Sequence, residues 1–283
     1  MITDTAVRKK GVAPVPVLAI NSPFTRYGPE NERVVRETDV KQDKAVEEMK
    51  ELYRKTKSIN RPNRNALLLP GHNPDDYVIS WYNHAADSLK KCHYSAAEIE
   101  RFSIALTAFQ DEITFPEKAG LFLSVLINNC KNKDCVVHTA HLAVSIDYLG
   151  YKNTKNITVE GNAGLYVGNE MKRGTITVKG NAGNLTGNRM RGGTILVKGN
   201  TGESVGLGMR CGNIFVDGNA GHSVGAWAKG GKIHIEGRIE GNVNIGPRCH
   251  LQNHESGKKF ILGEYARGTV FHKGMLILDK GKP

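Results

Sequence analysis

The sequence predicts a mainly β protein, in which a parallel β-helix of 19-residue coils follows a mostly α-helical N-terminal part. The first observation is a fixed period, because the same residue type recurs every 19 residues at Ile157, Ile176, Ile195, Ile214 and Ile233. The second is a glycine-rich phrase around each isoleucine, close to I-x-V-x-G-N-A-G-x-x-V-G-x-x-M-(K/R)-x-G. A period of this size is typical of a solenoid, in which each repeat is one coil stacked on the last.

Charge and cysteine content narrow the class of partner and compartment. The 283-residue chain carries 39 Lys and Arg against 28 Asp and Glu, a formal net charge of +11. This excess favours an acidic partner, an anionic ligand or nucleic acid, although solubility alone also explains it. Five cysteines without disulfide-framework spacing indicate a reducing, cytoplasmic compartment. Residues 1–20 lack a signal-peptide pattern and no run of 18 apolar residues occurs, so we expect no membrane span.

The N-terminal half divides into an irregular arm, residues 1–38, and a helical domain, residues 39–134. Residues 39–57 predict a polar helix with a weak apolar stripe through Met49 and Tyr53, and residues 58–76 predict a proline-rich linker. Ser95 and Glu98 have the spacing of a capping box, which predicts a helix start. Pro116 predicts a second start, followed by an apolar run to Asn129. No motif in this part indicates what it does.

Residues 135–283 are predicted to form the β-helix. Alternation of apolar and polar residues begins after Cys135, and the regular coils cover about residues 153–250. Residues 251–283 keep strand-like pieces but lose the repeat, so we expect them to form a C-terminal cap. A cap is needed because a solenoid must close its open ends.

Written beneath one another, the coils give columns of equivalent residues that stack at the strand spacing of about 4.8 Å. We expect the Ile column to share the core with two others: Val159, Val178, Val197, Val216 and Ile235; and Val167, Thr186, Val205, Val224 and Val243. Three glycine columns, which begin at Gly161, Gly164 and Gly168, predict bends with positive φ or close backbone approach. The spacing of these glycines is not a dinucleotide-binding loop, because it recurs in successive coils with no helix after it. The column Asn162, Asn181, Asn200 and Asn219 predicts side-chain amides that hydrogen-bond along the stack.

One column consists of cations only: Lys172, Arg191, Arg210, Lys229 and Arg248. At the coil spacing, each neighbouring pair repels by about 1 kcal/mol in water before screening. The column that begins at Glu160 and Lys179 instead mixes its signs. The basic column therefore predicts an anion-binding or partner-binding surface. The alternative is that the cations extend into solvent, with their stems over the neighbouring methionine column that begins at Met171.

Other candidate chemistry is sparse. A C-x4-C-x2-H-x2-H cluster contains ligand types that suit zinc, at Cys130, Cys135, His138 and His141, but its spacing also fits reduced thiols and hydrogen-bonded histidines. Ligand types recur in a turn-like segment at His72, Asp75 and Asp76, where turn hydrogen bonds are the alternative. Cys211 and Cys249 are two coils apart, about 9–10 Å, too far for a disulfide. No catalytic constellation can be assembled; His222 and His234 are the nearest candidates for a catalytic imidazole, and neither has an evident partner.

The phrase from Met171 to Gly183, repeated from Met190 to Gly202, resembles the GXGXG family of right-handed β-helices. That family includes the β-helix subunit of formylmethanofuran dehydrogenase, the matching subunit of formyltransferase/hydrolase complexes, and the C-terminal domain of the glutamate synthase large subunit. The resemblance covers about residues 135–250, and the wording is most similar to the formylmethanofuran dehydrogenase type. It implies a right-handed coil; a left-handed helix of hexapeptides has a period of 18, which does not fit 19.

The resemblance implies a non-catalytic scaffold subunit of an oxidoreductase or formyl-transfer complex in one-carbon metabolism. Larger catalytic subunits would be its partners and would carry the molybdenum or tungsten, iron–sulfur, zinc or flavin cofactors, with none held by this chain. A glutamate-synthase-type subunit is the alternative within the family. A self-standing β-helix enzyme and a polyanion-binding protein are the alternatives of another class; nucleic acid is disfavoured because the basic column lacks interleaved aromatic residues.

Overall fold

The computed structural model describes residues 32–56, 59, 76–243, 245, 249–253, 261–262, 269–272 and 275–279. The chain divides into two compact units, Met1–Lys41 and Gln42–Pro283. Helix α1 (Glu32–Lys55) supplies all described residues of the first unit, and its side chains are described from Lys44 onward.

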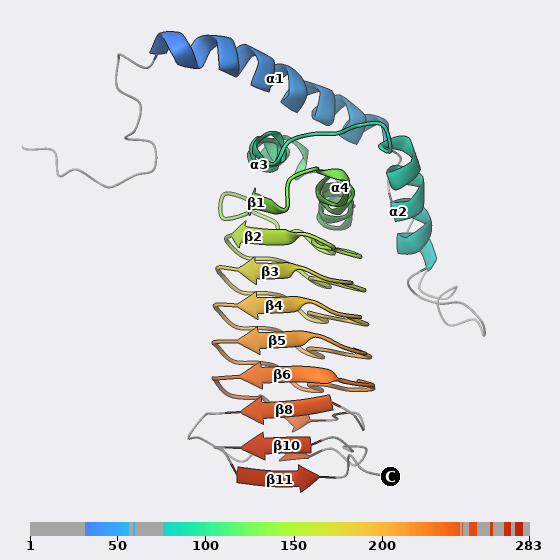
Figure 1. Cartoon of the computed structure of the whole chain (residues 1–283), viewed down its shortest axis with the longest axis vertical. Coiled ribbons are helices and arrows are strands. Elements are labelled where there is room, and N and C mark those ends of the chain that lie inside the picture. Colours follow the sequence, from blue (N-terminus) through green and yellow to red (C-terminus); the bar gives the residue numbers. More distant parts are fainter. Residues whose placement is uncertain are drawn as a thin grey trace, which may run out of the picture. The chain divides into compact units, whose positions relative to one another are not determined.

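Among the described residues, nine strands form one sheet in which each coil contributes one strand (Figure 1). The strands follow chain order: β1 Asp134–His138, β2 Asn156–Glu160, β3 Thr175–Val178, β4 Thr194–Val197, β5 Asn213–Val216, β6 Gly231–Ile235, β8 Cys249–Asn253, β10 Thr269–His272 and β11 Met275–Asp279. Neighbouring strands pair in parallel, except that β10 and β11 are antiparallel. A second small sheet pairs β7 (Asn242–Val243) with β9 (Ile261–Leu262). The predicted parallel β-helix is therefore confirmed.

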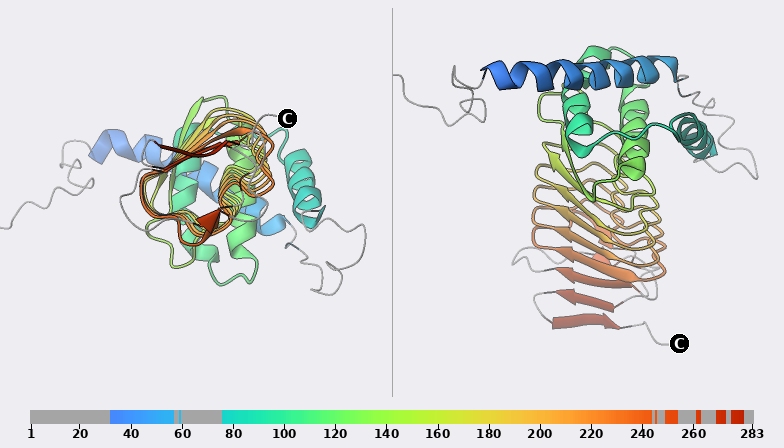
Figure 2. Two further views of the ribbon diagram at one scale, coloured as in Figure 1. Left: turned by 90° about the horizontal axis from the view of Figure 1, so that it is seen from below. Right: turned by 45° about the horizontal axis from the view of Figure 1, so that its top comes forward.

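The register of this sheet is the 19-residue period itself. Ile176 pairs with Ile157 on one side and with Ile195 on the other, and the Ile column continues through Ile233 to Leu251. All three predicted core columns are buried; in the first two, the reason is that alternate residues of each strand point into the coil. Viewed along the stack, successive coils superpose (Figure 2).

The glycine columns have two different causes. The columns that begin at Gly161 and Gly164 are set mainly by close approach: a Cβ at Gly183 would lie 2.7 Å from the carbonyl of Gly164 in the preceding coil. The third column adopts positive φ, as at Gly187, where φ is 72°. Positive φ is not confined to glycine, because flanking positions of the same turn also adopt it. The non-glycine residues are Tyr148, Lys152, Tyr166, Glu170, Leu185, Arg189, Ser204, Ser223 and Trp227.

The asparagine column stabilises the stack in a way the sequence did not predict. Each side chain bonds to the backbone of the next coil rather than to the next amide: Oδ1 of Asn162 accepts the N–H of Asn181 at 2.8 Å. The same bond recurs from Asn181 to Asn200 and from Asn200 to Asn219. The column is thus a row of corner braces, each of which satisfies one backbone donor.

The helices of the second unit pack around the first coil. They are the C-terminal part of α1, α2 (Asp76–Ser88), α3 (Ala96–Ala105), the 3₁₀ turn η4 (Leu106–Phe109) and α4 (Phe115–Asn129). The Ser95–Glu98 capping box and the proline at the start of α4 are confirmed. Helix α1 begins at Glu32 rather than residue 39, and α2 was not predicted. Tyr53 of α1 is fully buried against the rings of Phe102, Phe109 and Phe122, so this helix is anchored by aromatic packing.

Side chains of α3 and α4 take the place of a missing coil at the N-terminal end of the stack. Ser124 of α4 accepts the N–H groups of Gly150 and Tyr151, at 2.9 and 3.2 Å, and its hydroxyl lies 2.6 Å from Gly120 O of its own helix, to which it donates. Ser103 of α3 accepts the N–H of His138 in β1 at 2.9 Å. The helices therefore cap the β-helix, because they satisfy backbone groups that would otherwise be unpaired at its open end.

In the part of the chain that the structure describes, every helix is too short or too polar to cross a membrane.

We predict that Ile195→Ala lowers the free energy of unfolding by about 2–5 kcal/mol, because it leaves a cavity in the middle of the fully buried Ile column. Ile113→Ala is the matched control, since its side chain is 91% exposed, and we expect a change within about 0.5 kcal/mol. Urea unfolding followed by circular dichroism measures both. Equal effects of the two substitutions would contradict the assignment of the Ile column to the core.

Candidate functional site

The basic column lies on the outside of the coil, just before each strand begins. Lys172, Arg191, Arg210 and Lys229 are all exposed, whereas Arg248 lies outside the described residues. The preceding methionines, Met171, Met190 and Met209, are fully buried, whereas the cations that follow them are exposed. Adjacent residues simply point to opposite sides of the coil wall. We name the four described cations the basic edge.

Little negative charge offsets this basic edge. Arg191 pairs with Glu170 at 3.0 Å, and within the described ranges Lys172, Arg210 and Lys229 make no ion pair. The mixed column behaves differently, because there Lys198 pairs with Asp217 at 2.9 Å, one coil away. The stack can therefore neutralise a charged column, but within the described residues it leaves the basic edge exposed and largely unpaired.

Lys152 shows how crowded the positive charge is at the first of these coils. Its pKa is lowered, first by burial and then by repulsion from Lys172 and Arg191, while Glu170 acts in the opposite direction. Its ammonium group also lies 5.1 Å from the ring centroid of Tyr151. Glu170 is itself buried, and its carboxylate offsets two of these cations: it pairs with Arg191 at 3.0 Å and raises the pKa of Lys152.

A basic pocket continues this surface toward helix α4. Its volume is about 610 Å³, and its lining includes Lys131, Lys133, Lys155 and Arg173. Lys155 donates to the carbonyl of Cys130 at 2.5 Å. The other three cations have no ion-pair partner in the described part of the chain. The lining holds amides and hydroxyls but no carboxylate, so an anion would find hydrogen-bond donors there.

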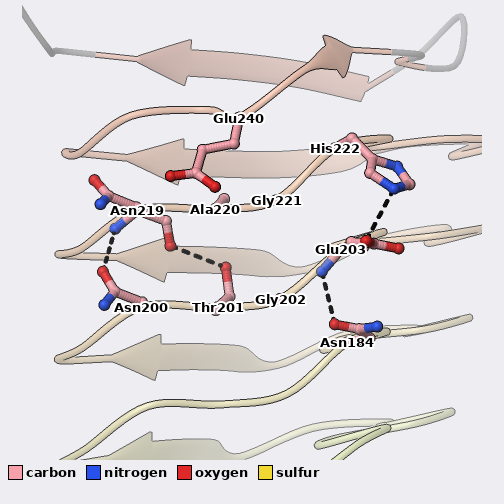
Figure 3. A pocket seen from close by; sticks show the side chains of 10 residues that line it. All are labelled: Asn184, Asn200, Thr201, Gly202, Glu203, Asn219, Ala220, Gly221, His222 and Glu240. Carbon is pink, nitrogen blue, oxygen red and sulfur yellow. Dashed lines mark hydrogen bonds and ion pairs between the residues drawn. The ribbon is translucent and has the colours of Figure 1, made fainter.

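A different corner of the stack holds the polar pocket drawn in Figure 3, with a volume of about 370 Å³. His222 Nε2 lies 3.0 Å from Glu203 Oε1, and its Nδ1 lies 3.0 Å from Ser223 Oγ. His222 thus has the partner that the sequence did not reveal. The signal was present, because residues 203 and 222 differ by one period.

This polar pocket is suited to hydrogen bonding rather than to acid–base chemistry. The imidazole and the Glu203 carboxylate are both about half-exposed, at 52% and 48%. Glu240 points toward Asn219 and away from the imidazole, so the two carboxylates do not converge on it (Figure 3). An ion pair that is this exposed to water contributes little to the free energy of folding. His234, the other predicted imidazole, packs 5.4 Å from the ring of Phe215 on the sheet face.

The predicted Cys/His cluster does not assemble. Cys130 and Cys135 are buried beside each other, whereas His138 Nε2 bonds Glu100 at 2.9 Å and His141 Nε2 bonds the carbonyl of Ile104 at 3.0 Å. The reason is the strand period, since residues 135 and 138 of β1 point to opposite faces. Groups of three or more ligating side chains do not occur among the described residues.

The second ligand-like segment falls mostly outside the described residues, which leave out His72 and Asp75. Asp76 is the first residue of α2, where a carboxylate stabilises the helix dipole. Cys211 is an exposed free thiol, and the side chain of Cys249 lies outside the described residues.

Neither a scan against protein-family models nor a search of curated proteins found a match for this chain.

We predict that Glu170→Gln lowers the free energy of unfolding at neutral pH by about 1 kcal/mol, because Arg191 loses its ion-pair partner and Lys152 loses the nearby negative charge. A lowered lysine pKa destabilises the fold below that pKa, and the penalty disappears as pH rises toward 10.5, the ordinary value for Lys152. The substitution lowers the pKa of Lys152 further, so this gain in stability should begin at lower pH. Urea unfolding across pH, at low and high salt, measures it.

The control for this prediction is Glu51→Gln on α1, whose carboxylate pairs with Arg54 at 3.5 Å in an exposed position. We expect it to change stability by no more than a few tenths of a kcal/mol. A loss at Glu170 that is insensitive to salt would show that shape rather than charge causes the effect.

We predict that Cys135 resists alkylation by iodoacetamide at pH 8, while Cys211 reacts. Burial, with a smaller contribution from Cys130, raises the pKa of Cys135 to about 12, so the reactive thiolate is absent. Cys211 is exposed. Mass spectrometry of the native and the urea-unfolded chain reports each site, and equal labelling of both cysteines in the native state would refute the burial of Cys135.

Proposed function

We propose that this chain is a non-catalytic, right-handed β-helix subunit that docks and positions larger catalytic subunits of an oxidoreductase or formyl-transfer complex. The single observation that carries the proposal is the basic edge, exposed along consecutive coils and largely unpaired. The repeated M-(K/R)-x-G-x-I-x-V-x-G-N-A-G wording supports the β-helix subunit of formylmethanofuran dehydrogenase as the nearest type. The molybdenum or tungsten, iron–sulfur, zinc or flavin groups would belong to the partner subunits, in the cytoplasm.

The physical argument for docking is electrostatic. A partner surface rich in Asp and Glu would remove the repulsion between neighbouring cations and would be steered to the edge by their combined field. The polar pocket around His222 also favours a non-catalytic subunit, because its half-exposed groups offer hydrogen bonds but no enclosed reaction centre. A glutamate-synthase-type subunit would use the same surface, and the identity of the captured partner separates the two.

Polyanion binding is the second candidate, and the basic pocket beside α4 favours it. Lys131, Lys133 and Arg173 could hold a phosphate chain there without any contact with a partner protein. The two functions differ in which cations matter: a docked protein covers the edge through Arg210 and Lys229, whereas an anion in the pocket does not reach those coils.

We predict that the purified chain captures larger subunits from its native extract, and that Arg210→Glu with Lys229→Glu reduces capture at least tenfold. Both cations are exposed and lack an ion pair within the described ranges, so their reversal changes the edge without breaking an internal contact. Capture should also weaken as salt is raised, because screening reduces exposed electrostatics. Quantitative mass spectrometry of the captured proteins measures both effects.

The matched control is Lys90→Glu with Lys91→Glu, at two exposed lysines that follow α2. It lowers the net charge by the same amount, from +11 to +7. Equal loss in both double variants would show that net charge alone is sensed. Capture of polyphosphate or random oligonucleotides, with no protein partner, would replace docking by polyanion binding.

A further inference from the structure

Trp227 is a residue that the fold itself does not require. Its side chain is 78% exposed, so it adds little to the core. Its φ is 56°, in the left-handed region that a bulky aromatic residue disfavours. The equivalent positions in earlier coils hold Lys152, Glu170, Arg189 and Gly208, so the coil accepts small or polar residues there. Neither burial nor backbone preference explains a tryptophan at this position, and Trp is a residue type enriched where proteins contact a partner.

A recess lies beside this tryptophan because the preceding coil has a glycine at the same position. Gly208 stands between Arg189 and Trp227, and the three belong to consecutive coils. The resulting pocket has a volume of about 290 Å³, and Tyr166, Leu185 and Leu207 contribute to its lining. A Cβ at Gly208 would meet only Arg189 Cγ, at 3.5 Å, so the space above the glycine is open. We name this recess the Trp227 slot.

The width of the Trp227 slot suits one planar side chain. Its two walls are two coils apart, about 9.6 Å at the spacing of parallel strands. A ring placed midway would lie roughly 4.8 Å from the backbone of each flanking coil, a spacing that falls within the range of about 4.5–7 Å for aromatic stacking on Trp227 and within about 6 Å for a guanidinium over a ring at Arg189. Trp, Tyr and Arg, the residue types that most often anchor protein interfaces, are all present in its lining.

The charge around the Trp227 slot indicates the rest of the ligand. The three positions of the slot are each followed, two residues later, by a cation of the basic edge: Arg191, Arg210 and Lys229. A side chain in the slot would therefore bring its chain neighbours against a row of cations. An anionic membrane also attracts a basic surface with an exposed tryptophan, but one ring gives weak anchoring, and a recess that admits a side chain favours a protein.

We propose that the Trp227 slot binds an aromatic side chain from an acidic segment of a partner protein. The proposal rests on the docking function proposed above and adds the chemistry of the contact: one ring between Trp227 and Arg189, over Gly208, flanked by carboxylates on the basic edge. The aromatic ring supplies the anchor, and the carboxylates supply orientation and salt dependence.

The test uses the full chain and a synthetic peptide, acetyl-Glu-Asp-Glu-Phe-Glu-Asp-Glu-amide, with Trp fluorescence as the readout. The chain has two tryptophans, and the other, Trp81, is 7% exposed, so acrylamide quenching reports mainly Trp227. We expect saturable binding that protects Trp227 from acrylamide. The same peptide with Ala in place of Phe should bind about tenfold more weakly, as expected for loss of one buried aromatic side chain.

Two substitutions at Gly208 make a matched pair. Both place a Cβ in the left-handed conformation that Arg189 and Trp227 already adopt, with φ of 52° and 56°, so their backbone strain is equal. Gly208→Ala leaves the Trp227 slot open and should keep the preference for Phe over Ala. Gly208→Gln fills it and should abolish that preference while weak, salt-dependent binding remains. Thermal unfolding confirms that the pair is equally folded.

Equal affinity for the Phe and Ala peptides, equal behaviour of the two Gly208 variants, or no saturable binding would overturn the proposal. Vesicles of phosphatidylglycerol that protect Trp227 equally in both Gly208 variants, without peptide binding, would assign the tryptophan to a membrane surface. If the Arg210→Glu, Lys229→Glu chain loses its partner but the slot variants do not, this inference fails and docking stands. If the chain prefers the Phe peptide and Gly208→Gln abolishes that preference, but no subunit is captured from the extract, the docking function fails and the Trp227 slot stands.

Discussion

Parallel hydrogen bonding between consecutive coils, held in one 19-residue register, is the constraint on which the rest of this structure depends. It continues beyond the strands, since Gly180 N bonds Gly161 O at 2.9 Å and Gly199 N bonds Gly180 O at 3.0 Å through the corner. Glycine is required there because the coils are too close for a Cβ. The asparagine side chains hold this spacing between coils by hydrogen bonds to the next coil, and the buried isoleucines hold it by packing inside the coil. Any residue that disturbs it affects both neighbouring coils.

A stack built this way has ends, and the ends explain the helical part. The first coil has backbone donors with no preceding coil, and hydroxyls from α3 and α4 accept them. Asn128 of α4 adds a third bridge, since its Oδ1 accepts the N–H of Thr154 at 3.2 Å. The helices are thus bonded directly to the first coil of the β-helix. They hold in place the end of the stack from which the basic edge begins.

The periodic features and the local helix starts at Ser95 and Pro116 could be predicted from the sequence, whereas contacts between distant, non-repeating residues could not. Ile195 and its equivalents identify their own neighbours, because a fixed period states which residues stack. The capping role of Ser124 has no such signal, since a serine in an apolar helix looks the same whether or not it faces a sheet edge. The spacing of Cys130, Cys135, His138 and His141 suggested a cluster that does not form, because spacing along the chain does not show which face of a strand each side chain points to. The His222–Glu203 pair was within reach, because one period separates them.

The position of Trp227 required the backbone as well as the period. Its column is legible in the sequence, but a column does not reveal that φ is positive or that the ring is exposed. The positive φ and the exposed ring together show that the fold does not require a tryptophan at this position. The same holds for Gly208, where one more glycine in a glycine-rich chain becomes informative once its surroundings are known to be open.

The basic edge has a linear charge density that the backbone itself sets. Hydrogen bonding places the coils about 4.8 Å apart, so the edge carries one cation per coil at that spacing. In water two unit charges interact with the thermal energy RT at a separation of about 7 Å, which is longer than the coil spacing. A row this dense gathers small anions along its length, as a nucleic acid gathers cations. Release of those anions would then make docking at this edge entropy-driven, and the number released would grow with the number of coils covered.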